Sequence, residues 1–206
     1  MLPAQRLYVL TCYFLATSVA RPLEHALASR AAADPTVTIS AGVVVGTATQ
    51  YPGTRSSNAE FLGIPFARSP PERFGLPEPA EAWPDPLPAQ QYAPACIQFD
   101  DTVSALNPAL LNGQSEDCLY ANVFVPPNTT SGSRKTVMFW IYGGNLQNGG
   151  SSISIYDGSS FAANQDVIVV TFNYRLNGMF SAAVKSDAYL LEDSLWVFEC
   201  SRHPGC

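Results

Sequence analysis

Residues 115–126 read SEDCLYANVFVP, and residues 140–145, one short linker later, read WIYGGN. The first stretch enters a partly alternating apolar run that stops at Pro126, a pattern typical of a half-buried β-strand. The second ends a nearly continuous apolar run, residues 136–141, with paired glycines, a pattern typical of a strand covered on both faces and followed by a turn. Together the two stretches predict the start of a central sheet.

Residues 166–172 form another nearly continuous apolar run, which also predicts a strand covered on both faces. Between the two buried strands, residues 157–164 (DGSSFAAN) predict a short helix, with Asp157 as its cap. A strand, a helix and a second strand in this order are expected to form a right-handed crossover. The expected fold class is therefore α/β.

The N-terminal part of the fold begins with two β-branched runs, residues 36–40 and 42–46, which predict paired short strands in a small edge sheet. Residues 61–67 (FLGIPFA) contain a glycine and a proline, which predict a fixed bend where the chain passes over the core.

Residues 65–94 are rich in proline, which by itself predicts an extended linker. Large aromatic side chains favour burial, however, and four of them are interleaved with the prolines. They are Phe66, Phe74, Trp83 and Tyr92. We therefore predict an irregular covering that packs on the core.

These motifs, taken in order, resemble the type-B carboxylesterases, the secreted lipase and cholinesterase branch of the α/β-hydrolases. The resemblance covers roughly residues 36–177 and is carried by GIPFA at 63–67, SEDCL at 115–119, the glycines at 143–144 and NYR at 173–175. It implies an incomplete α/β-hydrolase fold, made of an N-terminal edge hairpin and the first strands of the central sheet. It also implies hydrolysis of carboxylic esters through a serine acyl-enzyme, without a metal or any other cofactor.

The resemblance assigns an oxyanion hole to the backbone amides of Gly144 and Asn145. Such amides can stabilise the negative charge that develops on the carbonyl oxygen of an ester. Asn145 replaces the third glycine of the family; it keeps the N–H but adds a Cβ, so we expect a narrower mouth to the hole. Without the neighbouring motifs, two glycines after a strand would indicate a plain turn.

The resemblance further implies two structural contacts. Cys96 and Cys118 are expected to form a disulfide, which by closing a loop of roughly twenty residues stabilises the fold by about 3 kcal/mol. Glu116 is expected to form a buried ion pair with Arg73. Glu116 and Asp117 are not expected to act together as an acid and a base, because neighbouring side chains in a strand point to opposite faces.

No catalytic residue is predicted. The sequence contains no nucleophile elbow of the form G-x-S-x-G, since the stretches around Ser115 and Ser160 lack the closing glycine. The two histidines, His25 and His203, do not follow such a serine, although the order of an α/β-hydrolase triad requires it. We therefore expect this chain to be inactive by itself. The NYR segment is interpreted as polar side chains that hold the end of a strand.

The chain divides into four expected segments. Residues 1–20 predict a cleaved signal peptide, because their apolar run is too short for a membrane span and ends at small residues. Residues 21–34 predict a flexible leader and residues 35–180 the carboxylesterase-like part. Residues 181–206 do not resemble the family and read like a translated intron or a shifted reading frame; the pairing of their cysteines, Cys200 and Cys206, stays open.

The predicted compartment is extracellular, and the sequon at Asn128 is expected to carry a glycan on a turn. The net charge of -6 argues against a nucleic-acid partner, because such binding requires a basic surface. We expect no stable membrane insertion. The oligomeric state stays open.

The segment between Cys96 and Cys118 contains Phe99 as its one aromatic residue, which favours a small or medium ester substrate. Two alternatives remain at this point. The parent protein could be a non-catalytic, cholinesterase-like secreted binding protein. The chain could instead be a binding module in its own right, which predicts a cooperative melt and a soluble monomer, whereas a fragment is expected to aggregate through unpaired apolar strands.

Overall fold

The computed structural model describes residues 34–98 and 113–179. These residues belong to a compact unit, Ala32–Cys206, that is separate from Met1–Ala31. The predicted signal peptide and leader, the tail after residue 180, both histidines, Cys200 and Cys206 lie outside the described residues.

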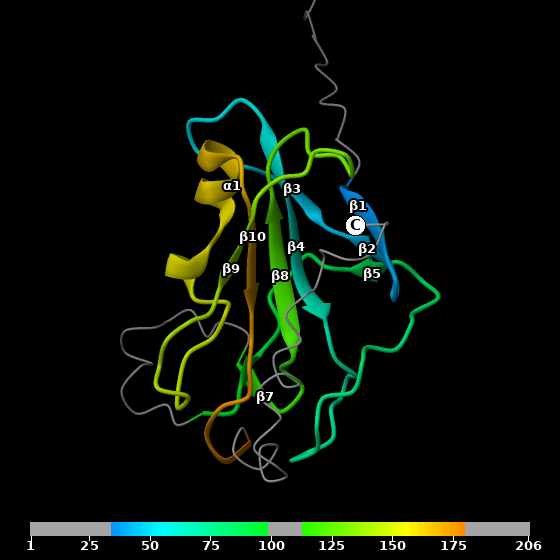
Figure 1. Cartoon of the computed structure of the whole chain (residues 1–206), viewed down its shortest axis with the longest axis vertical. Helices are drawn as coiled ribbons and strands as arrows, with labels where there is room; N and C mark the ends of the chain where they lie inside the picture. The colour runs from blue at the N-terminus through cyan, green and yellow to red at the C-terminus, as the bar shows by residue number, and fades with distance from the viewer. Residues whose placement is uncertain (1–33, 99–112, 180–206) are drawn as a thin grey trace, which may run out of the picture. The chain divides into compact units, whose positions relative to one another are not determined.

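The centre of the fold is a five-stranded sheet in the order β3-β4-β8-β10-β9 (Figure 1). Its strands are β3 (Thr47–Gln50), β4 (Ser57–Pro65), β8 (Tyr120–Val125), β10 (Ile168–Phe172) and β9 (Val137–Trp140). β8 pairs antiparallel with both β4 and β10, whereas β10 and β9 are parallel. The parallel pair requires a crossover connection, which contains the helix α1 (Ser159–Gln165).

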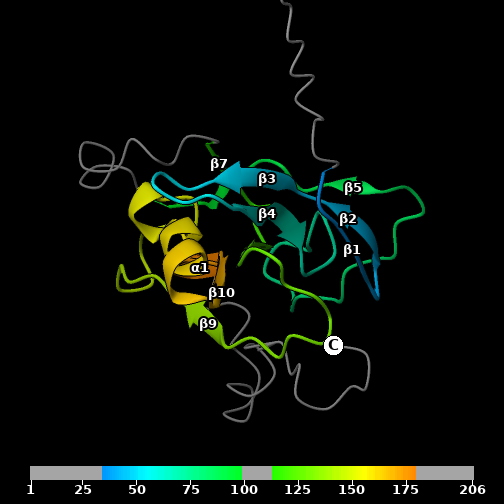
Figure 2. The same cartoon turned by 90° about the horizontal axis from the view of Figure 1, so that it is seen from above.

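The helix α1 covers one face of the sheet, where it contacts β4, β8 and β10 (Figures 1 and 2). Its Ala162 is fully buried against Phe124 of β8 and Val169 of β10. The predicted helix is confirmed, but Asp157 is not its N-cap, which is Gly158. The Asp157 carboxylate still accepts a 2.8 Å hydrogen bond from the Ser159 amide in the first turn. The mixed sheet with its crossover helix confirms the α/β class and forms part of an α/β-hydrolase fold.

The prediction that both apolar runs form strands covered on two faces is correct for β10 and wrong for β9. In β9, Val137 is 46% exposed and Trp140 is 43% exposed. Within the described part of the chain β9 pairs with β10 alone, so it forms an edge of the sheet. An apolar run identifies a strand but does not give its position in the strand order. β8 is more buried than predicted, because it lies between two strands and beneath α1.

The predicted N-terminal hairpin is present. β1 (Thr36–Ile39) and β2 (Gly42–Val45) pair antiparallel, and β5 (Leu87–Pro88) adds a third, parallel strand beside β2. The predicted bend at residues 61–67 lies inside a strand instead: β4 continues to Pro65, and its pairing with β8 shifts between Phe61 and Ile64. Between these two residues Gly63 adopts φ +74°, so the glycine does bend the chain, as a bulge within β4.

The proline-rich segment packs on the core as predicted. Trp83 donates a 2.9 Å hydrogen bond to the Val43 carbonyl, and Tyr92 packs against the cluster around Phe124. Phe66 lies edge-on to Phe172. The prediction is wrong for Phe74, whose side chain is exposed. The segment ends in β6 (Ala95–Cys96), which pairs in parallel with β7 (Gln114–Ser115).

Candidate functional site

The candidate oxyanion turn follows the carboxyl end of β9. Gly144 adopts φ +136°, and a Cβ at this position would lie 1.9 Å from the Asn148 carbonyl oxygen, so only glycine fits without a rearrangement. The Gly144 carbonyl closes the turn by accepting hydrogen bonds from the amides of Gln147 at 3.0 Å and Asn148 at 3.3 Å. Asn145 has φ +56°, a left-handed conformation that asparagine tolerates better than most residues with a side chain.

The residues of this turn are largely exposed. Gly143 and Asn145 are exposed, Gly144 is half-buried, and none of the three amides donates a hydrogen bond to another described residue. Because β9 and β10 are parallel, the turn lies at the same edge of the sheet as residues 173–175, which follow β10. Ligands of open α/β sheets bind at this carboxyl edge.

Tyr174 holds the residue that precedes the turn. Its ring stacks on that of Tyr142 with centroids 4.3 Å apart, and its hydroxyl donates a 2.6 Å hydrogen bond to the Tyr142 carbonyl. Burial raises the pKa of the Tyr142 phenol, which therefore stays neutral at physiological pH.

Asn173 fixes the chain beyond the turn. Its Oδ1 accepts hydrogen bonds from both the amide and the hydroxyl of Ser151, each at 2.9 Å, while its Nδ2 donates to the Pro94 carbonyl at 3.0 Å. Asn122 of β8 donates to the same Ser151 hydroxyl at 3.0 Å. Because these side chains are buried, water does not reach their polar atoms, and hydrogen bonds within the protein satisfy them instead.

Arg175 completes the NYR segment by donating to two backbone carbonyls, those of Glu72 at 2.8 Å and Gly75. Asn173, Tyr174 and Arg175 thus each bind a different loop. The interpretation of NYR as a segment that holds a strand end is confirmed.

The disulfide expected from the resemblance is present. Cys96 and Cys118 are buried and joined with a Cα–Cα distance of 5.0 Å across 22 residues of sequence. It connects β6 to the chain that enters β8.

The structure also brings Arg73 and Glu116 together. Arg73 Nε donates to Glu116 Oε2 at 2.8 Å, and Nη2 donates to Oε1, which makes a two-pronged pair. This hydrogen bonding lowers the pKa of Glu116. The prediction of a buried pair is wrong, however, because the side chains are 65% and 35% exposed. The buried arginine in this region is Arg175, which binds carbonyl groups instead of a carboxylate.

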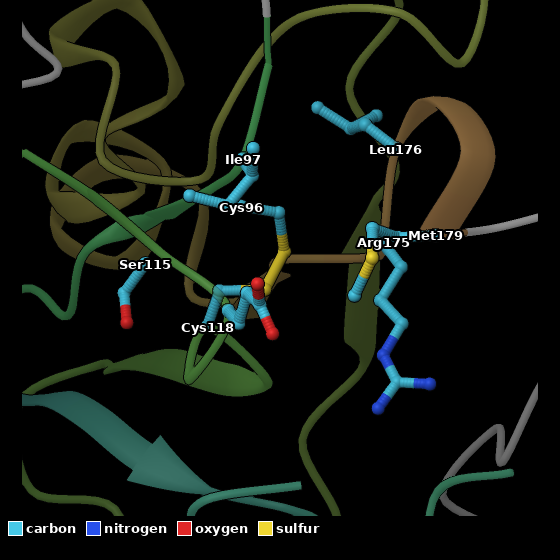
Figure 3. Close-up of a pocket in the computed structure, with 8 residues that line it drawn as sticks. Cys96, Ile97, Ser115, Cys118, Arg175, Leu176 and Met179 are labelled. Carbon is cyan, nitrogen blue, oxygen red and sulfur yellow. A yellow bond between two sulfur atoms is a disulfide. The ribbon is translucent and has the colours of Figure 1, made fainter. Parts of the chain in front are cut away.

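A small cavity adjoins the disulfide (Figure 3). Its walls consist of Cys96, Ile97, Ser115, Glu116, Cys118, Arg175, Leu176 and Met179. Its volume of about 10 Å³ suffices for about one water molecule, so it cannot hold an ester.

Two of the described serines, Ser159 and Ser115, form structural hydrogen bonds. The buried hydroxyl of Ser159 donates a 2.8 Å hydrogen bond to the Glu60 carboxylate, and the hydroxyl of Ser115 accepts one from the Asp117 amide. Sequence reasoning missed the Ser159–Glu60 contact, which joins residues 99 positions apart. Among residues 34–98 and 113–179, no group of three or more potential metal ligands is found.

The glycosylation candidate lies where a sugar can be accommodated. Asn128 is exposed on the turn after β8, and the neighbouring Thr129 hydroxyl donates to the Pro126 carbonyl at 2.7 Å. No helix in the described ranges has the length and apolar character required to cross a bilayer.

The sheet order, the crossover helix and the glycine turn define the class of this protein as an α/β-hydrolase fold of which the chain forms one part. The chain belongs to the carboxylesterase family, whose sequence model matches residues 33–186.

Three relatives illustrate the similarity. The chain is 42% identical to an acetylcholinesterase of Electrophorus electricus over 171 residues, which is 78% of this chain and 26% of the relative. It is 40% identical to liver carboxylesterase B-1 of Rattus norvegicus over 158 residues, 71% of this chain and 28% of the relative. It is 43% identical to the para-nitrobenzyl esterase of Bacillus subtilis over 157 residues, 74% of this chain and 30% of the relative. The chain therefore spans less than a third of each of these proteins.

Proposed function

We propose that this chain forms the carbonyl-polarising part of a carboxylic ester hydrolase that acts through a serine acyl-enzyme. The observation that carries the proposal is the glycine turn at the carboxyl edge of the sheet, where the consecutive amides of Gly144 and Asn145 donate no hydrogen bond to another described residue. Amides fixed in this way stabilise a developing oxyanion without reorganisation. The similarity to named esterases supports the same reaction class.

The 206 residues are proposed to be inactive by themselves. The sequence has no G-x-S-x-G motif, and the described serines at positions 115 and 159 are engaged in structural hydrogen bonds. The purified chain, given a chromogenic short-chain ester, should therefore show no turnover above background. Turnover that a serine-directed inhibitor abolishes would contradict this part of the proposal.

A chimera tests the proposed function directly. Residues 33–186, the part that the family model matches, would replace the corresponding part of the para-nitrobenzyl esterase, to which the chain is 43% identical over 157 residues. The recipient would supply the nucleophile, and the grafted turn would supply the oxyanion donors. We expect the chimera to hydrolyse chromogenic esters of small or medium size.

The alternative is a non-catalytic, cholinesterase-like binding protein. Asn145, in place of a third glycine, is the observation that favours it, because its Cβ narrows the approach to the amides. A folded chimera that is inactive but becomes active after Asn145→Gly would support this alternative.

The protein is also proposed to be secreted, with residues 1–20 as a signal peptide and a glycan on Asn128. The disulfide fits an oxidising compartment. Expression in a secretory eukaryotic host should give a medium-borne product that loses mass on treatment with a glycosidase. Asn128→Gln should abolish that mass loss.

A further inference from the structure

Gln98 is a buried glutamine that forms a two-way hydrogen-bond pair with the backbone of Gly149. Its Oε1 accepts from the Gly149 amide at 2.7 Å, and its Nε2 donates to the Gly149 carbonyl at 2.8 Å. Gln98 is 8% exposed and Gly149 is buried. Buried backbone N–H and C=O groups need hydrogen-bond partners. The side-chain amide of Gln98 supplies both partners of Gly149, as a neighbouring strand does in a sheet.

Gly149 lies a few residues after Gly144 and Asn145 of the candidate oxyanion turn. It adopts φ +120°, and a Cβ at this position would lie 2.5 Å from the ring of Tyr142. The backbone of Gly149 therefore lies directly against the residue that precedes the turn. Tyr174 hydrogen-bonds to Tyr142, just before the turn, and Gln98 hydrogen-bonds to Gly149, just after it.

Gln98 is itself fixed by the disulfide region. Its Nε2 also donates to the Cys96 carbonyl at 3.0 Å, and its backbone amide donates to Gln114 Oε1 at 2.9 Å. Cys96 is bound to Cys118. A short chain of contacts thus runs from the disulfide through one side chain to the base of the turn.

We propose that Gln98 is the positioning residue of the glycine turn and that the Cys96–Cys118 disulfide acts on the turn through it. The proposal rests on the proposed function for the oxyanion role of the turn. We call the two hydrogen bonds between the Gln98 side chain and the Gly149 backbone the hydrogen-bond clamp. The clamp can be tested without any ester turnover, because hydrogen exchange measures the protection of backbone amides directly.

The test is hydrogen exchange on the monomeric fraction of the full chain. Gln98→Met keeps the size of the side chain and removes both bonds to Gly149. We expect the amides of Gln147, Asn148 and Gly149, which donate hydrogen bonds, to lose protection by about tenfold or more. The amides of β8 and β10 should keep theirs, because local opening is separable from global unfolding. The matched control is Gln90→Met, which removes a glutamine that donates to the Gly46 carbonyl and should leave the turn unchanged.

Gln98→Glu distinguishes a hydrogen-bonding role of Gln98 from a role in packing alone. An ionised carboxylate still accepts from the Gly149 amide but cannot donate to its carbonyl, whereas a protonated carboxyl can do both. Burial raises the pKa of such a carboxyl. Protection factors of the turn in this variant, measured relative to those of the wild type at the same pH, should therefore increase as the pH is lowered towards about 4.

Reduction of the disulfide completes the test. It should lower protection of the turn in the wild type and add little in Gln98→Met, because both changes remove the same clamp. Unchanged protection of the amides of Gln147, Asn148 and Gly149 in Gln98→Met would overturn the proposal, as would an equal loss across β8 and β10 in both Gln98 variants. If hydrogen exchange confirms the clamp but the folded chimera is inactive, the positioning role of Gln98 is supported and the oxyanion role of the glycine turn is not.

Discussion

The Tyr174 hydroxyl donates a 2.6 Å hydrogen bond to the Tyr142 carbonyl while the two rings stack 4.3 Å apart. The contact joins the chain after β10 to the chain just before the glycine turn. Tyr174→Phe should retain the stack and lose the hydrogen bond, which lowers the free energy of unfolding by about 0.5–1.5 kcal/mol. Urea denaturation measures the difference. Tyr51→Phe is the control. An equal change in the free energy of unfolding in both variants would show that the Tyr174–Tyr142 hydrogen bond has no specific role.

The two glycines of the turn should respond differently to substitution. Gly144→Ala places a Cβ 1.9 Å from the Asn148 carbonyl oxygen and strains φ, whereas a Cβ at Gly143 meets no atom within 4 Å. We expect Gly144→Ala to lower stability by about 1–3 kcal/mol and Gly143→Ala to leave it nearly unchanged. Thermal melts followed by circular dichroism measure both. Similar melting temperatures for the two variants would show that the turn is not held in this conformation.

Removal of the disulfide should lower stability. The replacement of both Cys96 and Cys118 by serine frees a loop that spans 22 residues, and the expected loss is about 3 kcal/mol from the greater entropy of the unfolded chain. Urea midpoints of the oxidised wild type and the double variant give the value. Equal midpoints would contradict a stabilising role for the disulfide.

Glu60 should make stability depend on pH. Burial raises its pKa above 4.5, opposed by the hydrogen bonds from Ser159 and Thr49 and reinforced by Asp157. The folded state therefore holds the proton more tightly than the unfolded state, so stability is greatest below the ordinary pKa and decreases as the pH rises through the raised value. Glu60→Gln should remove this decrease, and Ser159→Ala should make it steeper.

Unfolding free energies of the wild type, Glu60→Gln and Ser159→Ala between about pH 3.5 and pH 8 check this prediction, because that range brackets ordinary and raised carboxyl pKa values. Parallel curves for the wild type and Glu60→Gln would contradict it.

The sequence predicts most of the strands but not their order. Apolar runs identify β8, β9, β10 and the first hairpin, and the resemblance supplies the glycine turn and the disulfide. The glycine and proline of residues 61–67 predict a bend, yet pairing with β8 keeps this segment in the sheet as far as Pro65, around a bulge at Gly63. Local signals report what a residue favours, whereas strand pairing depends on a partner far along the chain.

Side-chain contacts over long separations were the least predictable part of the site. Gln98 and Gly149 are 51 positions apart, and nothing in either local pattern indicates that a glutamine amide will pair with a glycine backbone. The Arg73–Glu116 pair was expected from the resemblance, but its exposure was not, because exposure depends on which loops cover the pair.

The rate of hydrolysis of a chromogenic short-chain ester by the esterase chimera is the most direct test of the account. We predict that the chimera carrying residues 33–186 is active, that Gly144→Ala lowers its kcat by roughly 100-fold or more, and that Gly143→Ala has little effect. Alanine keeps the N–H, but the clash of its Cβ with the Asn148 carbonyl should displace this donor, and loss of an oxyanion donor has this size. A folded chimera whose kcat is the same with and without Gly144→Ala would contradict the assignment of the oxyanion hole to this turn.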